Sequence, residues 1–294
     1  MSKIKGIYAA SMSVLNEDYT LNVAKTIKHA EMIIDNGCHG TAIFGSTGQA
    51  QLIPISKKVD LINQLALSKY KEKYIIGTGL NSLGETINLM NVARSLNFKR
   101  FLIMPPAYYK YGDDEVIKFY SKIVEAIPDS EIVLYNFEKL CGYKFSLECV
   151  QELVKRFPEQ IVGVKDSSYN LFENLKLDNF SILPGSESKL LKGLQLGCTG
   201  IITATCNATS ELSRKVYDDF QAGTEQTVNQ KLCDVRNIFE KYNLISGLHS
   251  FYSKKDHYYK NILPPLSILN SQDEQELFGN LDKINFSIKS LMAA

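Results

Sequence analysis

The chain has 294 residues, 45% of them hydrophobic, which is enough for one large α/β barrel or two ordinary domains with a sizeable core. Its 33 Lys and Arg residues nearly balance 32 Asp and Glu residues, so net charge gives no reason to expect nucleic acid or an anionic membrane as a partner. No apolar run approaches the roughly 20 residues of a membrane span.

Eight short apolar runs, rich in β-forming residues, recur along the chain and predict eight strands. They lie near residues 6–10, 40–45, 74–79, 100–104, 132–136, 161–165, 181–185 and 200–203. Amphipathic segments with a helical period separate them. Strands that are apolar throughout and alternate with helices predict a parallel sheet covered on both faces. At this length, that means a closed (β/α)8 TIM barrel.

Two of the intervening helices have recognisable start signals. One apolar series runs from Val116 to Ile127 with the 3.6-residue period, and Asp113 and Asp114 stand at its beginning as candidate caps. Ser146 precedes a second series in the same way. These residues predict where the helices after the fourth and fifth strands begin.

The eighth unit ends near Gly223, and the remaining residues carry no strand signal. We therefore divide the chain into a catalytic barrel, residues 1–223, and a C-terminal helical extension, residues 224–294, packed on the barrel. No linker composition argues for an independent domain. Helices are expected near residues 224–245, 249–261 and 272–292, separated by Gly247 and by the Leu263-Pro264-Pro265 sequence.

Lys165 is the first candidate catalytic residue because it closes the apolar strand that starts at Ile161. A lysine amine has an ordinary pKa of about 10.4 and is a poor nucleophile at neutral pH, so an enzyme that uses the free amine must desolvate it. The end of a buried strand provides that environment. A lysine that merely extends from a strand end into solvent is the competing interpretation.

Other polar residues also follow the predicted strands, at the end of the barrel where the loops of such folds carry the chemistry. They are Gly45-Ser46-Thr47-Gly48 after the second strand, Tyr135-Asn136 at the end of the fifth, Gly185-Ser186-Glu187 after the seventh, and Thr203-Ala204-Thr205 after the eighth. We expect them to converge around Lys165. The Ser46 to Gly48 turn offers hydroxyl and N–H groups that suit a carboxylate, and the Tyr135 phenol suits proton transfer.

In order and spacing, these motifs resemble the pyruvate-dependent class I aldolases of the dihydrodipicolinate synthase and N-acetylneuraminate lyase family. The resemblance covers nearly the whole chain. It rests on Gly45 to Gly48, the tyrosine-bearing loop from Pro105 to Tyr109, Leu134 to Asn136, Gly163 to Asp166, and Gly200 to Ile202 with Asn207.

The resemblance implies a role for each matching residue. Lys165 would form an imine with a 2-keto acid, Tyr135 would shuttle protons, and Ser46 with Thr47 would hold the keto acid's carboxylate. Tyr108 would reach toward the site of a neighbouring subunit, because family members are commonly homotetramers built as dimers of dimers. Neither a metal nor an organic cofactor is needed for such chemistry.

Gly48, Gly185, Glu187 and Thr203 complete the set of predicted substrate contacts. Glu187 has two readings, as an acceptor for a substrate hydroxyl or as a helix N-terminal charge ahead of Leu190.

The chain departs from the family pattern at several positions. Leu140 stands where synthases that condense pyruvate with aspartate semialdehyde carry an arginine, and a leucine cannot pair with a carboxylate. Lys139, one position away, lacks the planar fork of arginine. Glu138 replaces a proline, and Gln49 replaces a glutamate. Leu140 favours a 2-keto-3-deoxy sugar acid, or a related hydroxy keto acid, as the substrate.

Three hypotheses therefore stay open: an aldolase or lyase acting on such an acid, a dihydrodipicolinate synthase of the lysine pathway, and a barrel that binds a keto acid without turnover.

The six cysteines form no CxxC pair and read as free thiols in a reducing cytosol, so a cytoplasmic protein is expected. The four histidines show no zinc-binding spacing.

Overall fold

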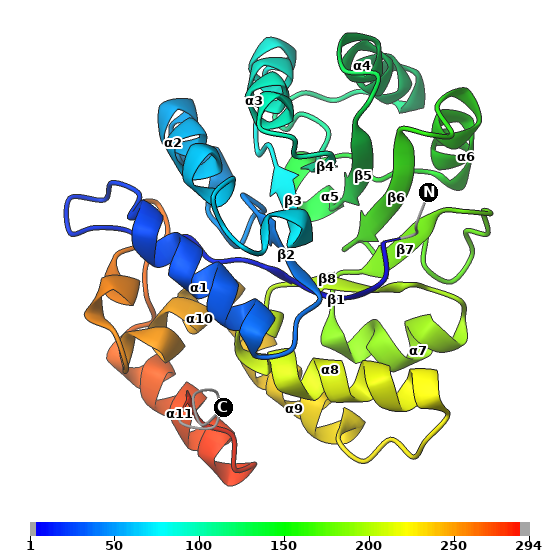
Figure 1. The fold of residues 1–294 in the computed structure, drawn as a ribbon. Helices are drawn as coiled ribbons and strands as arrows, with labels where there is room; N and C mark the ends of the chain where they lie inside the picture. The colour runs from blue at the N-terminus through cyan, green and yellow to red at the C-terminus, as the bar shows by residue number, and fades with distance from the viewer. Residues whose placement is uncertain (1–3, 289–294) are drawn as a thin grey trace.

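The structure, a computed structural model, describes residues 4–288 and forms a single eight-stranded parallel sheet. The strands are β1 (Gly6–Ala10), β2 (Gly40–Ile43), β3 (Tyr74–Gly77), β4 (Arg100–Ile103), β5 (Glu131–Asn136), β6 (Ile161–Asp166), β7 (Ser181–Pro184) and β8 (Gly200–Thr203). They are hydrogen-bonded in the order β7-β6-β5-β4-β3-β2-β1-β8. The ends of this order meet, because the Thr199 N–H donates to the Ile182 carbonyl at 3.1 Å. The predicted TIM barrel is confirmed as a nearly closed barrel (Figure 1).

Helices surround the sheet and continue beyond its last strand (Figure 1). They are α1 (Val23–Asp35), α2 (Ile55–Leu65), α3 (Leu83–Ser95), α4 (Asp113–Ala126), α5 (Glu138–Cys141), α6 (Leu147–Arg156), α7 (Leu190–Gln195), α8 (Cys206–Ala222), α9 (Asn229–Glu240), α10 (Leu244–Ser253) and α11 (Ser271–Lys283). Four 3-10 turns, η1 to η4, span Ala50–Leu52, Lys71–Lys73, Glu187–Lys189 and His257–Lys260.

Residues 167–180, between β6 and β7, form no helix, so one of the predicted alternations is wrong. The Asp166 side chain organises this segment instead. Its carboxylate accepts hydrogen bonds from the N–H groups of Tyr169, Leu171 and Phe172, each at 2.9 Å. A loop whose backbone donors are satisfied by one buried carboxylate does not need a helix to bury them.

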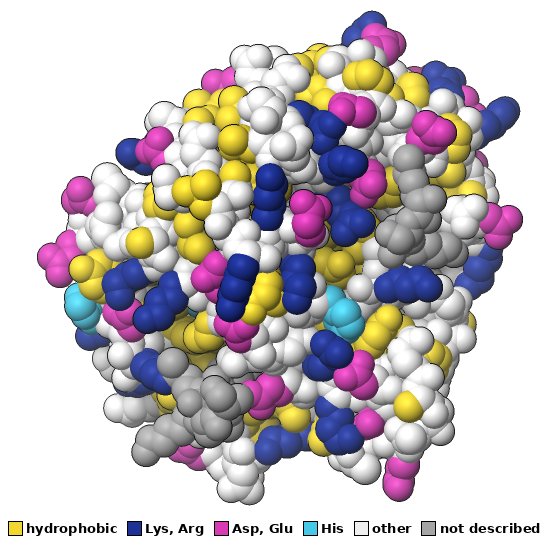
Figure 2. All heavy atoms as spheres, viewed as in Figure 1, with side chains coloured by type: hydrophobic (Ala, Val, Ile, Leu, Met, Phe, Trp, Pro, Cys, Tyr) yellow, Lys and Arg dark blue, Asp and Glu magenta, His cyan; other side chains and the backbone are white. Residues whose placement is uncertain are grey.

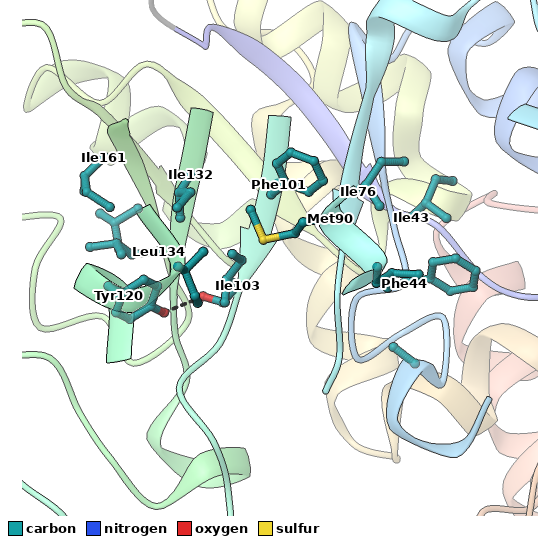
Figure 3. Close-up of a cluster of buried hydrophobic side chains, with 14 of the residues drawn as sticks. Ile43, Phe44, Ile76, Met90, Phe101, Ile103, Tyr120, Ile132, Leu134 and Ile161 are labelled. Atoms are coloured by element: carbon teal, nitrogen blue, oxygen red, sulfur yellow. Dashed lines mark hydrogen bonds between the residues drawn. The ribbon is translucent and has the colours of Figure 1, made fainter. Parts of the chain in front are cut away.

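The strands are apolar on both faces because both faces are covered. In β5, Ile132 and Leu134 point outward into a cluster shared with the helices, whereas Val133 and Tyr135 point into the barrel. Figure 3 shows the outward cluster, where the Tyr120 hydroxyl from α4 donates to the Ile103 carbonyl at 2.7 Å. The two-residue period of a strand therefore decides which side chains reach the interior.

The C-terminal helices pack on the barrel beside α1 and α8 (Figure 1). Met12 and Val14, just after β1, share an apolar cluster with Val235, Phe239 and other residues of α9 to α11. The chain after Gly223 is thus fixed against the same end of the barrel at which β1 finishes.

The predicted bounds of these last helices need correction. The expected helix over 224–245 is α9, which ends at Glu240, and the side chain of Asn243 then caps α10 by accepting the Ile245 and Ser246 N–H groups. Gly247, expected as a separator, lies inside α10. There, an added Cβ would be 3.3 Å from the Phe239 ring of α9, so glycine permits the close packing of the two helices. The predicted helix over 249–261 is therefore the end of α10 and the short η4 turn.

The last helix, expected over 272–292, ends at Lys283, and residues 289–292 lie outside the described part of the chain. Of the two predicted start signals, Ser146 is confirmed, and the prediction that Asp113 and Asp114 cap their helix is wrong. Ser146 caps α6 by accepting the Cys149 N–H at 2.9 Å. For α4, Asp113 and Asp114 lie in the first turn, and the cap is Gly112, whose N–H donates to the Glu115 side chain at 2.9 Å.

The surface mixes both signs of charge, as Figure 2 shows for one face. Across residues 4–288, no helix is long and apolar enough to cross a membrane. All six cysteines are free thiols, and five of them are buried.

We predict that Ser146→Ala destabilises the protein by about 1 kcal/mol, because it removes the cap of the helix that leads into β6. Urea unfolding would measure the loss. Ser56→Ala, at an exposed site in α2, is the control and should change stability by less than about 0.5 kcal/mol. Equal effects of the two substitutions would contradict the assignment of the cap.

Candidate active site

Lys165 and Tyr135 face each other across two neighbouring strands. They are register partners in the β5–β6 pair, and only 3% of Lys165 and 4% of Tyr135 is exposed. The Lys165 Nζ lies 4.1 Å from the centre of the Tyr135 ring. Within residues 4–288, no carboxylate lies within ion-pair distance of this amine. The lysine is thus almost fully buried and placed against a phenol.

The loop after β2 reaches the same point. The Ser46 hydroxyl and the Tyr135 hydroxyl are 3.0 Å apart and hydrogen-bonded. The turn itself is closed by two backbone bonds, from the Gly48 N–H to the Gly45 carbonyl at 3.1 Å and from the Gln49 N–H to the Ser46 carbonyl at 2.9 Å. The Ser46 hydroxyl is therefore hydrogen-bonded to the phenol of Tyr135, which faces Lys165.

A buried polar layer supports the two strand ends. Asn136 and Asp166, the residues that follow Tyr135 and Lys165, are also register partners, and the Asn136 amide donates to the Asp166 carboxylate at 2.8 Å. Burial raises the pKa of Asp166, although N–H donors from the following loop oppose the shift. This pair fixes the ends of β5 and β6 relative to each other, and hence the tyrosine relative to the lysine.

These groups open into a cavity of about 620 Å³, a size that suits a small-molecule ligand. It is lined by Ser46, Thr47, Tyr135, Phe137, Glu138, Lys139, Leu140, Lys165, Ser167, Ser168, Tyr169, Gly185, Ala204, Arg236, Glu240, Tyr242, Asn243, Leu244 and Ile245. Five of the predicted catalytic and substrate-contact residues are thereby brought together: Ser46, Thr47, Tyr135, Lys165 and Gly185.

Gly185 contributes by being small. A Cβ at this position would lie 2.2 Å from the Ser167 hydroxyl oxygen, so only glycine lets the loops after β6 and β7 approach so closely. Gly48 and Tyr108, in contrast, are not among the lining residues. The Gly48 carbonyl accepts a hydrogen bond from the Ser13 hydroxyl at 2.7 Å, which ties the turn to the segment after β1. Tyr108 is 90% exposed and turns away from the cavity of its own chain.

Glu187 and Thr203 lie behind the cavity wall and do not line it. The Glu187 carboxylate accepts from the Thr203 hydroxyl at 2.8 Å and the Thr205 hydroxyl at 3.1 Å. It also pairs with Arg236, whose Nη1 is 3.1 Å away. Neither reading of Glu187 from the sequence, as an acceptor for substrate or as a simple helix-end charge, included this ion pair. With Glu187 fully buried and Arg236 4% exposed, the pair holds the wall in place, and Arg236 is the member of the pair that lines the cavity.

Arg236 is the main residue that sequence reasoning missed. It reaches the barrel from α9, is 4% exposed and also pairs with Glu240 at 2.6 Å. Burial opposes its charge, but the two carboxylates outweigh burial and raise the pKa of Arg236. One signal was present in the sequence: the helical period places this arginine on the same face as Leu232, Val235 and Phe239, where an unpaired charge would be costly.

No group of three or more His, Cys, Asp or Glu side chains in the described chain is arranged to hold a metal ion. The site consists instead of a buried amine, a phenol, two hydroxyls and charged pairs at the rim. A parallel barrel that presents a buried lysine at the end of its sixth strand, opposite a tyrosine, is an enzyme of the class I aldolase type.

Comparison with known proteins makes the assignment specific. The model of the Dihydrodipicolinate synthetase family matches residues 3–284, and the chain belongs to that family. A probable 2-dehydro-3-deoxy-D-pentonate aldolase of Escherichia coli K12 is 26% identical over 252 residues, covering 81% of this chain and 83% of its own. A 4-hydroxy-tetrahydrodipicolinate synthase of Methanothermobacter thermautotrophicus is 25% identical over 257 residues, covering 84% of this chain and 87% of its own.

Solved structures agree on the fold. A prophage protein of the dihydrodipicolinic acid synthase family from Escherichia coli K12, in complex with pyruvate, superposes with a TM-score of 0.86 at 20% identity. The match covers 97% of this chain and 100% of that chain. The resemblance seen in the motifs is confirmed, and the protein is a lyase of this family.

We predict that Arg236→Leu destabilises the protein by about 3 to 5 kcal/mol, because it leaves the Glu187 carboxylate buried without its partner. Adding Glu187→Leu should recover much of that loss. Urea unfolding of both single variants and the double variant measures the coupling. Strictly additive losses would mean that the two charges do not depend on each other.

Proposed function

We propose that the protein is a Schiff-base-forming pyruvate aldolase that reversibly cleaves a 2-keto-3-deoxy sugar acid, or a related hydroxy keto acid, to pyruvate and an aldehyde. The observation that carries this proposal is the meeting of Lys165, Tyr135 and Ser46 in one cavity. The names of two similar proteins support it, because one is a probable 2-dehydro-3-deoxy-D-pentonate aldolase and the other was solved in complex with pyruvate.

The reaction begins when the Lys165 amine attacks the keto carbon. Loss of water then gives a protonated imine, which withdraws electrons from the neighbouring bonds. The bond between the third and fourth carbons breaks, its electron pair moves into an enamine of pyruvate, and the hydroxyl on the fourth carbon becomes the carbonyl of the aldehyde. Protonation of the enamine and hydrolysis of the imine release pyruvate and restore the amine.

Tyr135 handles the proton in this scheme. Its phenol lies beside the amine. During cleavage the phenol oxygen accepts the proton of the substrate hydroxyl, directly or through the bound carboxylate, while the phenol's own proton moves to the Ser46 oxygen; the reverse transfer restores both groups. The Ser46 hydroxyl, 3.0 Å from the phenol, continues the same hydrogen-bonded chain. Ser46 and Thr47 also bind the keto acid's carboxylate, which orients the carbonyl for attack.

The far end of the cavity favours a neutral, hydroxylated aldehyde. Leu140 provides no charge, and Arg236 is already paired with Glu187 and Glu240. Closely paired charges can donate to and accept from hydroxyl groups without leaving an unpaired ion behind. This end therefore suits the hydroxyl groups of a sugar-derived chain better than a second carboxylate.

The alternative is condensation of pyruvate with aspartate semialdehyde, as the name of the Methanothermobacter relative suggests. Lys139 favours it, since this lysine lies exposed at the cavity rim and, among residues 4–288, forms no ion pair. Turnover of pyruvate plus aspartate semialdehyde at rates far above those with sugar acids would establish this synthase.

We also propose that the protein acts in the cytoplasm as a homotetramer, a dimer of dimers. Tyr108 supports an interface, because its ring is 90% exposed and its backbone has a φ of 88°. A non-glycine residue held in that conformation is strained and needs support from its surroundings. In this proposal, Tyr108 reaches the active site of the neighbouring subunit.

We predict that incubation with pyruvate followed by borohydride attaches a reduced adduct to Lys165, because the reduced imine cannot be hydrolysed. Peptide mapping by mass spectrometry identifies the modified residue, and Lys165→Ala should abolish the adduct. Lys139→Ala, which removes the other lysine of the cavity, should retain it. An adduct absent from Lys165 would eliminate both the aldolase and the synthase. An adduct there without turnover of any aldehyde would favour the binding barrel.

We predict that Tyr135→Phe keeps the fold and still forms the imine but slows turnover by about 10² to 10⁴, the range expected for a proton-transfer group. Steady-state rates with the preferred keto acid, compared with borohydride trapping, separate the two steps. Tyr143→Phe, which removes a hydroxyl from a buried tyrosine outside the cavity, is the control. Unchanged turnover in Tyr135→Phe would count against its role.

A further inference from the structure

Gln49 links the carboxylate-binding turn to the C-terminal helices. It directly follows Ser46-Thr47-Gly48, is 2% exposed, and has a left-handed backbone with a φ of 54°. Its side-chain Oε1 accepts the Leu263 N–H at 2.7 Å, and its Nε2 lies 3.3 Å from the His249 Nε2. Both partners lie more than 190 residues further along the chain.

The hydrogen-bond donors in this contact can be assigned from its surroundings. The His249 Nδ1 is 2.8 Å from the Tyr259 carbonyl, and a carbonyl can only accept. Nδ1 therefore carries the ring proton, and Nε2 presents a lone pair. The amide of Gln49 must then donate to Nε2 while its oxygen accepts from Leu263. Glutamine offers one donor and one acceptor at these two ends, whereas an ionised glutamate of the same length offers acceptors only.

The groups around His249 keep its ring neutral. Burial lowers the pKa of His249 to about 4, and it lowers the pKa of His29, from α1, to about 4 as well. The other titratable groups of this layer are Tyr252, on the same helix, and Tyr259, from η4; burial raises the pKa of both. No carboxylate or ammonium group from the described chain forms an ion pair with the ring. His249 is thus an uncharged acceptor throughout the neutral pH range.

We propose that Gln49 is a positioning residue for the aldolase reaction: its amide bridges the unprotonated nitrogen of His249 and the Leu263 N–H, and thereby holds the Ser46–Gly48 turn in its carboxylate-binding shape. This inference rests on the proposed function for its link to the keto acid. The bridge makes the C-terminal region a structural part of the pyruvate end of the site, and glutamine at this position follows from the neutral histidine.

The experiment compares Gln49→Ala and Gln49→Glu with the wild type. The pyruvate concentration that gives half-maximal borohydride trapping measures the affinity for pyruvate. The hydrogen-exchange rate of the peptide covering residues 44–53 measures how firmly the turn is held. Gln49→Ala should need about tenfold more pyruvate, because the turn loses its anchor, and should exchange faster in this peptide. Turnover at saturating substrate should fall much less than the affinity for pyruvate.

Gln49→Glu has a distinct signature that a merely stabilising residue would not show. A carboxylate next to Nε2 favours protonated His249, so the bridge should persist at pH 5.5 and fail as the pH rises and the histidine loses its proton. The ratio of half-saturating pyruvate between variant and wild type should therefore increase about tenfold or more between pH 5.5 and pH 8.5. Because this variant nearly preserves shape, it also serves if Gln49→Ala does not fold.

His29→Gln is the matched control. His29 is equally buried and bonds Tyr259 and Asn207, but it makes no hydrogen bond to residues 45–49. It should lower the melting temperature without changing the pyruvate requirement or the exchange of the turn. The proposal is overturned if the wild type traps pyruvate and the Gln49 variants, while folded, need no more pyruvate than His29→Gln.

The two proposals fail in different ways. If the wild type traps no pyruvate at Lys165, the proposed function falls, and hydrogen exchange alone then decides whether Gln49 holds the turn. Faster exchange of peptide 44–53 in Gln49→Ala, but not in His29→Gln, supports the bridge even then. Equal exchange in the wild type and Gln49→Ala overturns it.

Discussion

The register between β5 and β6 is the constraint on which the site depends. Parallel pairing places Tyr135 opposite Lys165, and the two-residue period of a strand sends both side chains into the barrel. Sliding one strand by a single residue would turn one of them outward, into the layer beneath the helices. The bond between Asn136 and Asp166 lies one step further along the same pair and fixes this register at the strand ends. The placement of a buried amine beside a phenol is therefore a consequence of strand pairing.

Much of the architecture could be predicted from the sequence because it depends on local patterns. Continuous apolar runs located all eight strands, and polar residues after those runs identified Ser46, Thr47 and Gly185 as part of the cavity. Prediction was less successful where a distant segment decides the outcome. Glu187 and Thr203 follow strands as expected, yet they do not line the cavity. Both are hydrogen-bonded to Arg236 of α9, which lies 49 residues after Glu187 and 33 after Thr203.

Helix boundaries in the C-terminal region show the same limit. A glycine within an amphipathic series ordinarily indicates an interruption, but Gly247 lies inside α10, where it lets the Phe239 ring of α9 pack closely. The chain after the barrel thus contributes side chains to the cavity and its surroundings. It supplies Arg236 behind one wall, Tyr242 and Asn243 at the rim, and His249 next to the turn after β2. The barrel strands carry the reactive groups, and the extension determines the shape of the space around them.

The central claim is that a keto acid is bound covalently by Lys165 with its carboxylate on the turn after β2. A crystal structure of the protein soaked with pyruvate tests this most directly. The account predicts continuous electron density from the Lys165 Nζ to the second carbon of pyruvate, with the carboxylate within hydrogen-bond distance of Ser46 and Thr47. Pyruvate joined to a different lysine, or a Lys165 amine turned toward bulk water and away from the Tyr135 hydroxyl, would contradict it.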